Sequence, residues 1–96
     1  MKLVMVSYRF EYNEPMERIL GSHGLRDYIR ISQAQGSDQD GKHDGSKIYP
    51  GHMAQVWAQV QDDDVDDLLR DIEEFKNDKQ SHEHVTALVL GVEKSI

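Results

Sequence analysis

The chain has 96 residues, enough for one domain, and a chain this short buries a smaller share of its surface than a large domain does. Hydrophobic residues make up 38% of it and charged residues 30%, which indicates a globular protein with a modest core. Eighteen acidic and eleven basic side chains give a formal net charge of −7. This balance argues against nucleic acid as a partner, because binding phosphates requires a concentrated basic surface.

The sequence contains no cysteine, which excludes disulfides, thiolate catalysis and thiolate metal sites. The short apolar run from Leu3 to Val6 is followed by polar residues without a small-residue cleavage site, so we predict no signal peptide. No apolar run approaches the roughly 20 residues that a membrane helix needs. We therefore expect a cytoplasmic protein.

The first two elements are a strand and a short helix. Leu3–Tyr8 is apolar on both faces in its first part, which predicts a central strand covered on both sides. A helix should follow, with Asn13 as its N-cap and Pro15 in its first turn. Gly21 and Gly24 are expected to end this helix.

The next segment is a strand followed by one long loop. Apolar and polar residues alternate from Asp27 to Gln35, which predicts an edge strand with one wetter side. From Gly36 to His52 the sequence is rich in glycine and almost free of apolar residues, so we predict a structureless loop. Loops of this length in compact domains tend to be functional.

The last three elements are a strand, a helix and a strand. Met53–Val60 alternates between small aliphatic residues and a face that contains Trp57. Asp62–Lys76 has apolar residues at helical spacing and aspartates in its first turn, where the helix dipole favours them. Val85–Leu90 is predicted to be a strand with two apolar faces. Trp57 is interpreted as a core or interface residue rather than a platform for a ligand.

This order of elements predicts an α+β fold, namely a ferredoxin-like βαββαβ sandwich. A four-stranded antiparallel sheet would carry two helices on one face, with the first and third strands in the middle and a long loop between the second and third. The other face would hold Trp57, Met53 and one side each of Leu3–Val6 and Val85–Leu90. An apolar face of this size needs a cover, so we expect the chain to self-associate.

Several segments resemble those of P-II-like signalling proteins, in the superfamily of nitrogen regulatory protein P-II and CutA. They are Met1–Met5, the glycine-led loop from Gly36, Ile48–Gly51 and Val92–Lys94, and together the resemblance spans nearly the whole chain. It implies a trimeric regulator that is not an enzyme. In nitrogen regulatory P-II proteins the long loop and a second glycine-rich loop bind an adenine nucleotide between subunits, and the long loop docks on enzymes or transporters.

The second glycine-rich loop has no counterpart here, because residues 76–84 contain no glycine. The chain therefore resembles a divergent member, whose effector is an adenine nucleotide or another anion. Loop glycines permit the close backbone approach that suits wrapping around an anion. The predicted ligand-binding residues lie at the loop base: Gly36, Ser37, Gly51 and His52. The residues expected to dock on a target enzyme or membrane transporter are Asp38, Lys42, His43, Lys47 and Tyr49.

Two alternatives come from other classes of protein. His82 and His84 would point to one side of a strand and could share a metal with His43 or His52, as in a CutA-like accessory protein of an efflux system. The other alternative is a dimeric ferredoxin-like α/β-barrel enzyme with its site between helices and sheet. The acidic run from Asp38 fails as an EF-hand, because Lys42 and Tyr49 occupy its fifth and twelfth positions.

Overall fold

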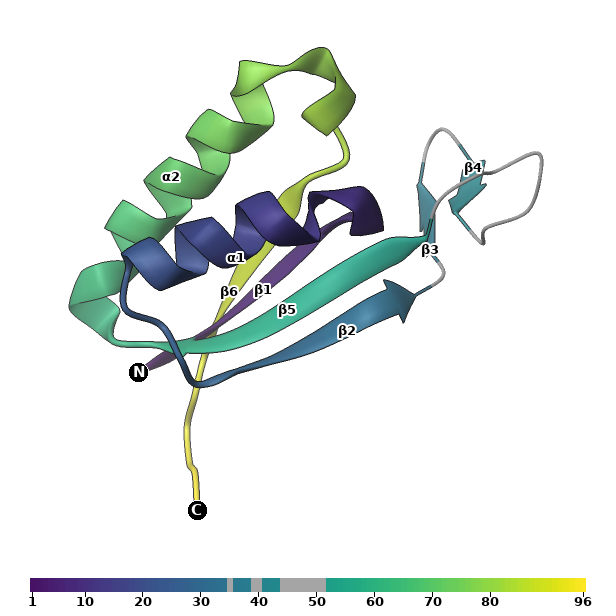
Figure 1. Ribbon diagram of the computed structural model, residues 1–96. Coiled ribbons are helices and arrows are strands. Elements are labelled where there is room, and N and C mark those ends of the chain that lie inside the picture. The colour runs from purple at the N-terminus through teal and green to yellow at the C-terminus, as the bar shows by residue number, and fades with distance from the viewer. Residues whose placement is uncertain (35, 39–40, 44–51) are drawn as a thin grey trace.

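The structure is a computed structural model that describes residues 1–34, 36–38, 41–43 and 52–96. Its main sheet is antiparallel, with the strand order β2-β5-β1-β6. The strands are β1 (Lys2–Arg9), β2 (Tyr28–Ala34), β5 (Met53–Val60) and β6 (Thr86–Gly91). Helices α1 (Asn13–Ser22) and α2 (Val65–Asp78) lie on the same face of this sheet (Figure 1). The predicted βαββαβ sandwich, with β1 and β5 in the middle, is confirmed.

The core lies between the helices and one face of the sheet. Every second residue of β1 and β5 points into it, because side chains alternate between the faces of a strand. The strands contribute Val4, Val6, Tyr8, Ala54, Val56, Ala58 and Val60, each no more than 2% exposed. The helices contribute Met16, Leu20, Leu68 and Ile72, each no more than 4% exposed.

Helix α1 begins differently from the prediction. Tyr12 rather than Asn13 is the N-cap, and no side-chain hydrogen bond caps the helix. Asn13 is instead the first helical residue, and its Oδ1 accepts a hydrogen bond of 2.7 Å from the Tyr8 hydroxyl. A buried hydroxyl needs a partner. The Asn13 amide therefore satisfies the core tyrosine instead of the helix terminus.

The end of α1 is a Schellman motif. Gly24 has a φ of +69°, and the bonds Gly24 N to Gly21 O (3.0 Å) and Leu25 N to Leu20 O (3.1 Å) close the last turn. The prediction that Gly24 ends the helix is correct because glycine adopts this backbone conformation without strain. Gly21, in contrast, lies within the helix.

The predicted edge strand is confirmed as β2, at the end of the sheet beside β5. Its register on β5 shifts between Ile31 and Ala34, which is the mark of a β-bulge. The bulge lies at the end of β2 that leads into the loop.

The segment from Gly36 to His52 was predicted to have no structure, and this is wrong for part of it. Strands β3 (Gly36–Asp38) and β4 (Gly41–His43) pair antiparallel as a small two-stranded sheet beyond the end of β2 and β5 (Figure 1). Ladder bonds join backbone groups, so a polar sequence can pair without the apolar alternation by which strands are predicted. Residues 39–40 and 44–51 lie outside the described part of the chain.

Two later elements are shifted from their predicted bounds. The segment predicted to be helical from Asp62 begins with a 3₁₀ turn at Asp62–Asp64, and α2 then runs to Asp78. Strand β6 begins at Thr86, one residue after the prediction, and Val85 before it is buried.

Candidate functional site

The sheet face without helices carries an apolar row across all four strands, which we call the open-face ladder. It consists of Ile29, Trp57, Met5 and Leu88, and each is the registered partner of the next. Leu3 and Leu90 form a further apolar pair on the same face. In the single chain Ile29 is 67% exposed and Leu88 is 62% exposed. A contiguous apolar surface of this kind marks an interaction site.

The open face becomes polar toward the loop. The Trp57 indole N–H donates to Gln55 Oε1 at 2.9 Å, and Gln55 Nε2 donates to Ser7 Oγ at 3.0 Å. This chain of hydrogen bonds satisfies the polar groups of a surface that would otherwise resist burial. Trp57 is therefore placed as an interface residue would be, with its ring on the open face and its N–H already paired.

The base of the loop lies at the polar end of that face. His52 is held against the end of β1, since the backbone N–H of Phe10 donates to its carbonyl oxygen at 2.9 Å. The rings of Phe10 and His52 meet edge to face, with centroids 6.1 Å apart. Of the other predicted ligand-binding residues, Gly36 and Ser37 begin β3, and Gly51 lies outside the described residues.

The residues predicted to dock on a target belong to the segment that contains β3 and β4. Asp38 ends β3, and Lys42 and His43 are in β4, where the backbone of His43 pairs with that of Gly36. This pairing brings the predicted docking strand next to the predicted ligand-binding strand. Lys47 and Tyr49 lie outside the described residues.

Arg9 is a charged residue at this site that the sequence patterns did not single out. It is the last residue of β1 and pairs in register with Met53, directly after His52. Its Nε lies 3.0 Å from Glu11 Oε1. The signal was present in the sequence, since Arg9 continues the alternation of Leu3, Met5 and Ser7, but the predicted strand stopped at Tyr8.

The prediction that His82 and His84 share one side of a strand is wrong. His82 belongs to a 3₁₀ turn (Gln80–His82), and His84 lies in the turn before β6. His82 is only 5% exposed, and its ring stacks on Phe75 with centroids 4.0 Å apart. Its Nδ1 lies 2.6 Å from the carbonyl oxygen of Phe75, which can only accept, so Nδ1 carries the proton. His82 is thus a core histidine.

In the part of the chain that the structure describes, no group of three or more His, Cys, Asp or Glu side chains could hold a metal ion. Within the same described ranges, no helix is long and apolar enough to cross a membrane.

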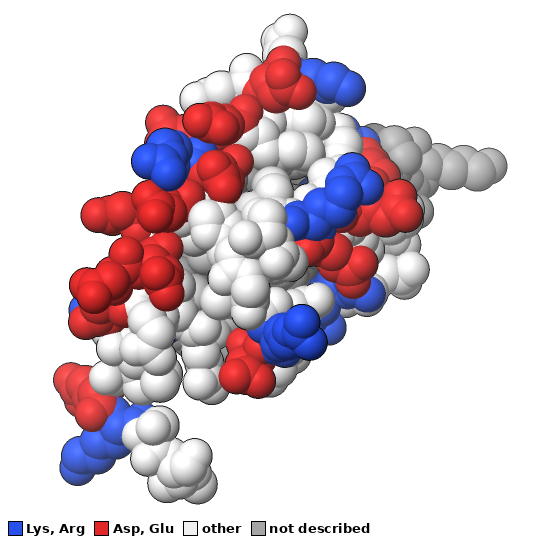
Figure 2. Space-filling view, turned by 60° about the vertical axis from the view of Figure 1, so that its left-hand side comes forward, with Lys and Arg blue, Asp and Glu red and all other residues white. Residues whose placement is uncertain are grey.

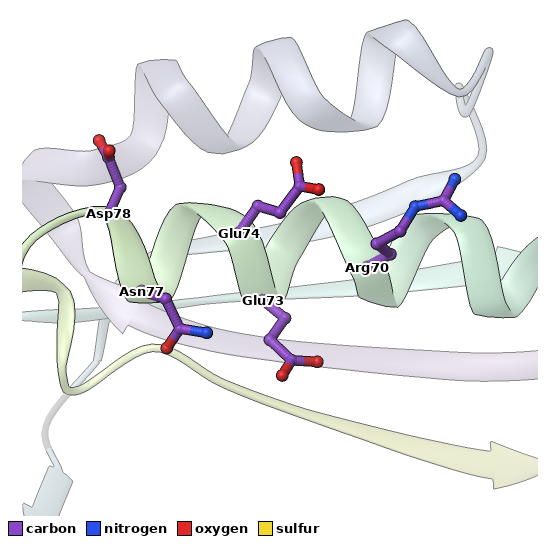
Figure 3. Close-up of a pocket in the computed structure, with 5 residues that line it drawn as sticks. All are labelled: Arg70, Glu73, Glu74, Asn77 and Asp78. Carbon is purple, nitrogen blue, oxygen red and sulfur yellow. The ribbon is translucent and has the colours of Figure 1, made fainter.

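The outer surface of α2 is strongly acidic. Figure 2 shows carboxylates gathered along this helix. A hollow of about 450 Å³ is lined by Arg70, Glu73, Glu74, Asn77 and Asp78. Figure 3 shows that their side chains diverge from the helix rather than converge on one point, with Glu73 and Asn77 on one side and Glu74 and Asp78 on the other. This surface is a solvated helix face, as acidic runs usually are.

The interior between helices and sheet, where a barrel enzyme would hold its substrate, is filled by side chains. Tyr8, Met16 and Leu68 are all 0% exposed there. Burial raises the pKa of the Tyr8 hydroxyl to about 12, so it stays protonated at neutral pH and donates to Asn13. Tyr8 is therefore neither ionised nor open to a ligand.

The fold is that of the PII-like signalling proteins, as predicted. CPII from Thiomonas intermedia K12, a nitrogen regulatory PII-like protein bound to ADP, AMP and bicarbonate, matches with a TM-score of 0.75 and 17% identity over 92% of this chain and 81% of its own. Its apo form matches with a TM-score of 0.64 and 16% identity over 95% of this chain and 91% of its own.

A PII-like signaling protein from Thermus thermophilus matches with a TM-score of 0.63 and 12% identity, over 92% of this chain and 80% of its own. No protein-family model and no curated sequence matches the chain. The likeness therefore concerns the fold alone.

Proposed function

We propose that the chain is a PII-like regulator rather than an enzyme. It works as a trimer, binds a small anionic effector in the clefts between subunits and docks on a target protein through residues 36–52. The observation that carries this proposal is the open-face ladder, an apolar surface that needs a cover and that lies on the same sheet face as the polar rows leading to the loop base. The CPII structures with ADP, AMP and bicarbonate support an effector of this class.

The composition of the open face supports self-association. Trp57 and its neighbours Met5 and Ile29 form the kind of aromatic and aliphatic centre that interfaces bury. A second copy presents the same surface, so each copy can cover another. The trimeric state is what the resemblance to P-II-like proteins adds.

The effector site is proposed at the loop base, with Gly36, Ser37, Gly51 and His52 as its residues. Assembly through the open face would bring the loop base of one copy near another copy, and this forms the cleft. Because residues 76–84 contain no glycine, the effector is either an adenine nucleotide held without the second glycine-rich loop or a smaller anion such as bicarbonate.

Docking is proposed through the same segment, with Asp38, Lys42, His43, Lys47 and Tyr49 presented to a target enzyme or membrane transporter in the cytoplasm. An effector that binds one arrangement of this segment more tightly than the others shifts the population toward that arrangement. The extent of docking then depends on the effector concentration.

The test combines three measurements on the wild-type chain. Light scattering should give a mass of three chains. Calorimetric titration with ADP, AMP and bicarbonate should show saturable binding of at least one of them. Hydrogen exchange should slow at the amides of Gly36–Asp38 and Gly41–His43 when that ligand is present.

Two variants sharpen this test. His52→Ala should weaken binding about tenfold, the loss typical of one charge-assisted contact. Arg70→Ala, on the outer surface of α2, is the control and should bind like the wild type. A monomeric wild-type chain that binds none of the three ligands and gains no protection would refute the proposed function.

A further inference from the structure

The open face changes character along β1, and its last residue is a cation. The residues of β1 on that face are, in order, Leu3, Met5, Ser7 and Arg9. The first two belong to the apolar part, and Ser7 accepts the hydrogen bond from Gln55. Arg9 therefore stands where the open face meets the loop base, one residue before the bond between Phe10 N and His52 O.

The guanidinium of Arg9 is incompletely paired. Its Nε is buried and has no hydrogen-bond partner among the described residues. Glu11 Oε1 lies only 3.0 Å away, so the two groups attract as charges but are not aligned for a hydrogen bond. Arg30, in contrast, donates a hydrogen bond to Glu17. Glu11 is thus an acidic neighbour of Arg9 that does not accept a well-aligned hydrogen bond from Nε.

The contact between Arg9 and Glu11 is also a weak one. The two side chains are 31% and 41% exposed, and ion pairs at such positions contribute little free energy. An arginine presents five donors in a planar fork that matches the oxygens of a carboxylate, bicarbonate or phosphate group. An oxyanion that is aligned with this fork can therefore replace Glu11.

We infer that Arg9 binds the oxyanion group of the effector at the loop base, and that Glu11 is an internal competitor which the effector displaces. The inference rests on the proposed function, which supplies the anionic effector. It answers a specific need, because a chain with a net charge of −7 and no glycine in residues 76–84 requires a local cation to hold an anion. Bicarbonate and the phosphates of a nucleotide share the recognised chemistry.

The experiment titrates bicarbonate, ADP and adenosine into the wild type and into two variants. Arg9→Gln should weaken the binding of the oxyanion ligands about 10- to 100-fold, the loss expected for charge-assisted hydrogen bonds. Glu11→Gln should tighten the same ligands about two- to fivefold, because it removes an exposed competing ion pair. Adenosine, which has no oxyanion, should respond to neither change. The ratio of ADP to bicarbonate affinity identifies the source of the oxyanion.

Arg70→Gln is the matched control, since it removes an arginine whose partner is Asp67 on the outer surface of α2. Oxyanion binding by the wild type that survives Arg9→Gln unchanged overturns the inference and leaves the proposed function standing. Absence of oxyanion binding in the wild type overturns the inference together with the anionic effector of the proposed function. If Arg9→Gln fails to fold or assemble, the Glu11→Gln variant provides the test. Unchanged oxyanion affinity in that variant overturns the inference.

Discussion

The two faces of the main sheet are built from the same strands, but one face is buried under helices and the other is exposed. On the covered face the side chains of Val4, Val6 and Tyr8 are 0% exposed, because α1 and α2 pack over them. On the open face, Trp57 is 38% exposed and Leu88 is 62% exposed. Neighbouring residues of one strand thus belong to a closed core and to an uncovered apolar surface.

This difference separates the stability of the chain from its assembly. The covered face gains its burial within one chain, so its contribution to the free energy of folding does not depend on protein concentration. The open face gains burial only from a partner, so its contribution follows mass action and grows with concentration. Substitutions on the two faces should therefore differ in kind as well as in size.

The largest effect should come from truncating the same residue type on each face. Leu68→Ala removes a leucine that is 0% exposed on α2, and we expect it to lower the free energy of unfolding by about 2–5 kcal/mol, as buried leucines do. Leu88→Ala on β6 should instead weaken the proposed trimer, so that dilution lowers the mass of this variant at a concentration at which the wild type still associates. Denaturation at several concentrations, together with light scattering, measures both quantities.

Arg70→Ala serves again as the surface control and should change neither quantity. Loss of stability in Leu88→Ala that is independent of concentration, with an unchanged mass, would show that the open face is not an interface.

A smaller loss of stability is expected from a substitution in the 3₁₀ turn Gln80–His82, after α2. His82→Ala removes a ring stacked on Phe75 and the hydrogen bond from Nδ1 to the Phe75 carbonyl oxygen. We expect the free energy of unfolding to fall by about 2 kcal/mol, since a partly buried acceptor loses its partner and the stacked ring is removed. Zinc and copper titrations should be unaffected. A variant that keeps its stability and loses metal affinity would favour the CutA-like alternative instead.

The sequence predicted the architecture well because its strongest signals come from burial. Alternation in Met53–Val60 and helical spacing in the segment after Asp62 both reflect residues that must face the core. The end of α1 was predictable for a different reason, since the positive φ of Gly24 favours glycine over other residues.

The sequence is less informative about features that depend on backbone or side-chain geometry. Pairing of β3 with β4 leaves no hydrophobic pattern in the sequence, so the pattern predicts a loop where the backbone forms two short strands. Asn13 was assigned to the helix N-cap by residue type, although the buried hydroxyl of Tyr8 uses it. At the candidate site, the backbone of His52 is held beside the end of β1, and its role in binding stays a prediction. Arg9 was harder to find, because its place on the open face depends on where a strand ends, which patterns locate poorly.

The smallest effect concerns the buried hydroxyl of Tyr8, near the end of β1 on the covered face. Tyr8→Phe should cost about 1 kcal/mol at pH 8, because Asn13 Oδ1 loses its hydrogen bond. Burial raises the pKa of Tyr8 to about 12 in the folded chain, above the ordinary value of 10.0 expected when the chain is unfolded. The unfolded state therefore releases the proton first as the pH rises, and stability that is present below about pH 10 is lost between about pH 10 and 12.

At about pH 11 this linkage should cost the wild type about 1.4 kcal/mol relative to pH 8, whereas Tyr8→Phe has no proton to lose at this position. The stability advantage of the wild type at about pH 8 should thus vanish or reverse at about pH 11, as measured by urea midpoints of both proteins. A constant difference between them at the two pH values would mean that the covered face does not hold the Tyr8 hydroxyl away from water. The contrast between a sealed and an open face of the sheet would then be weaker than the packing indicates.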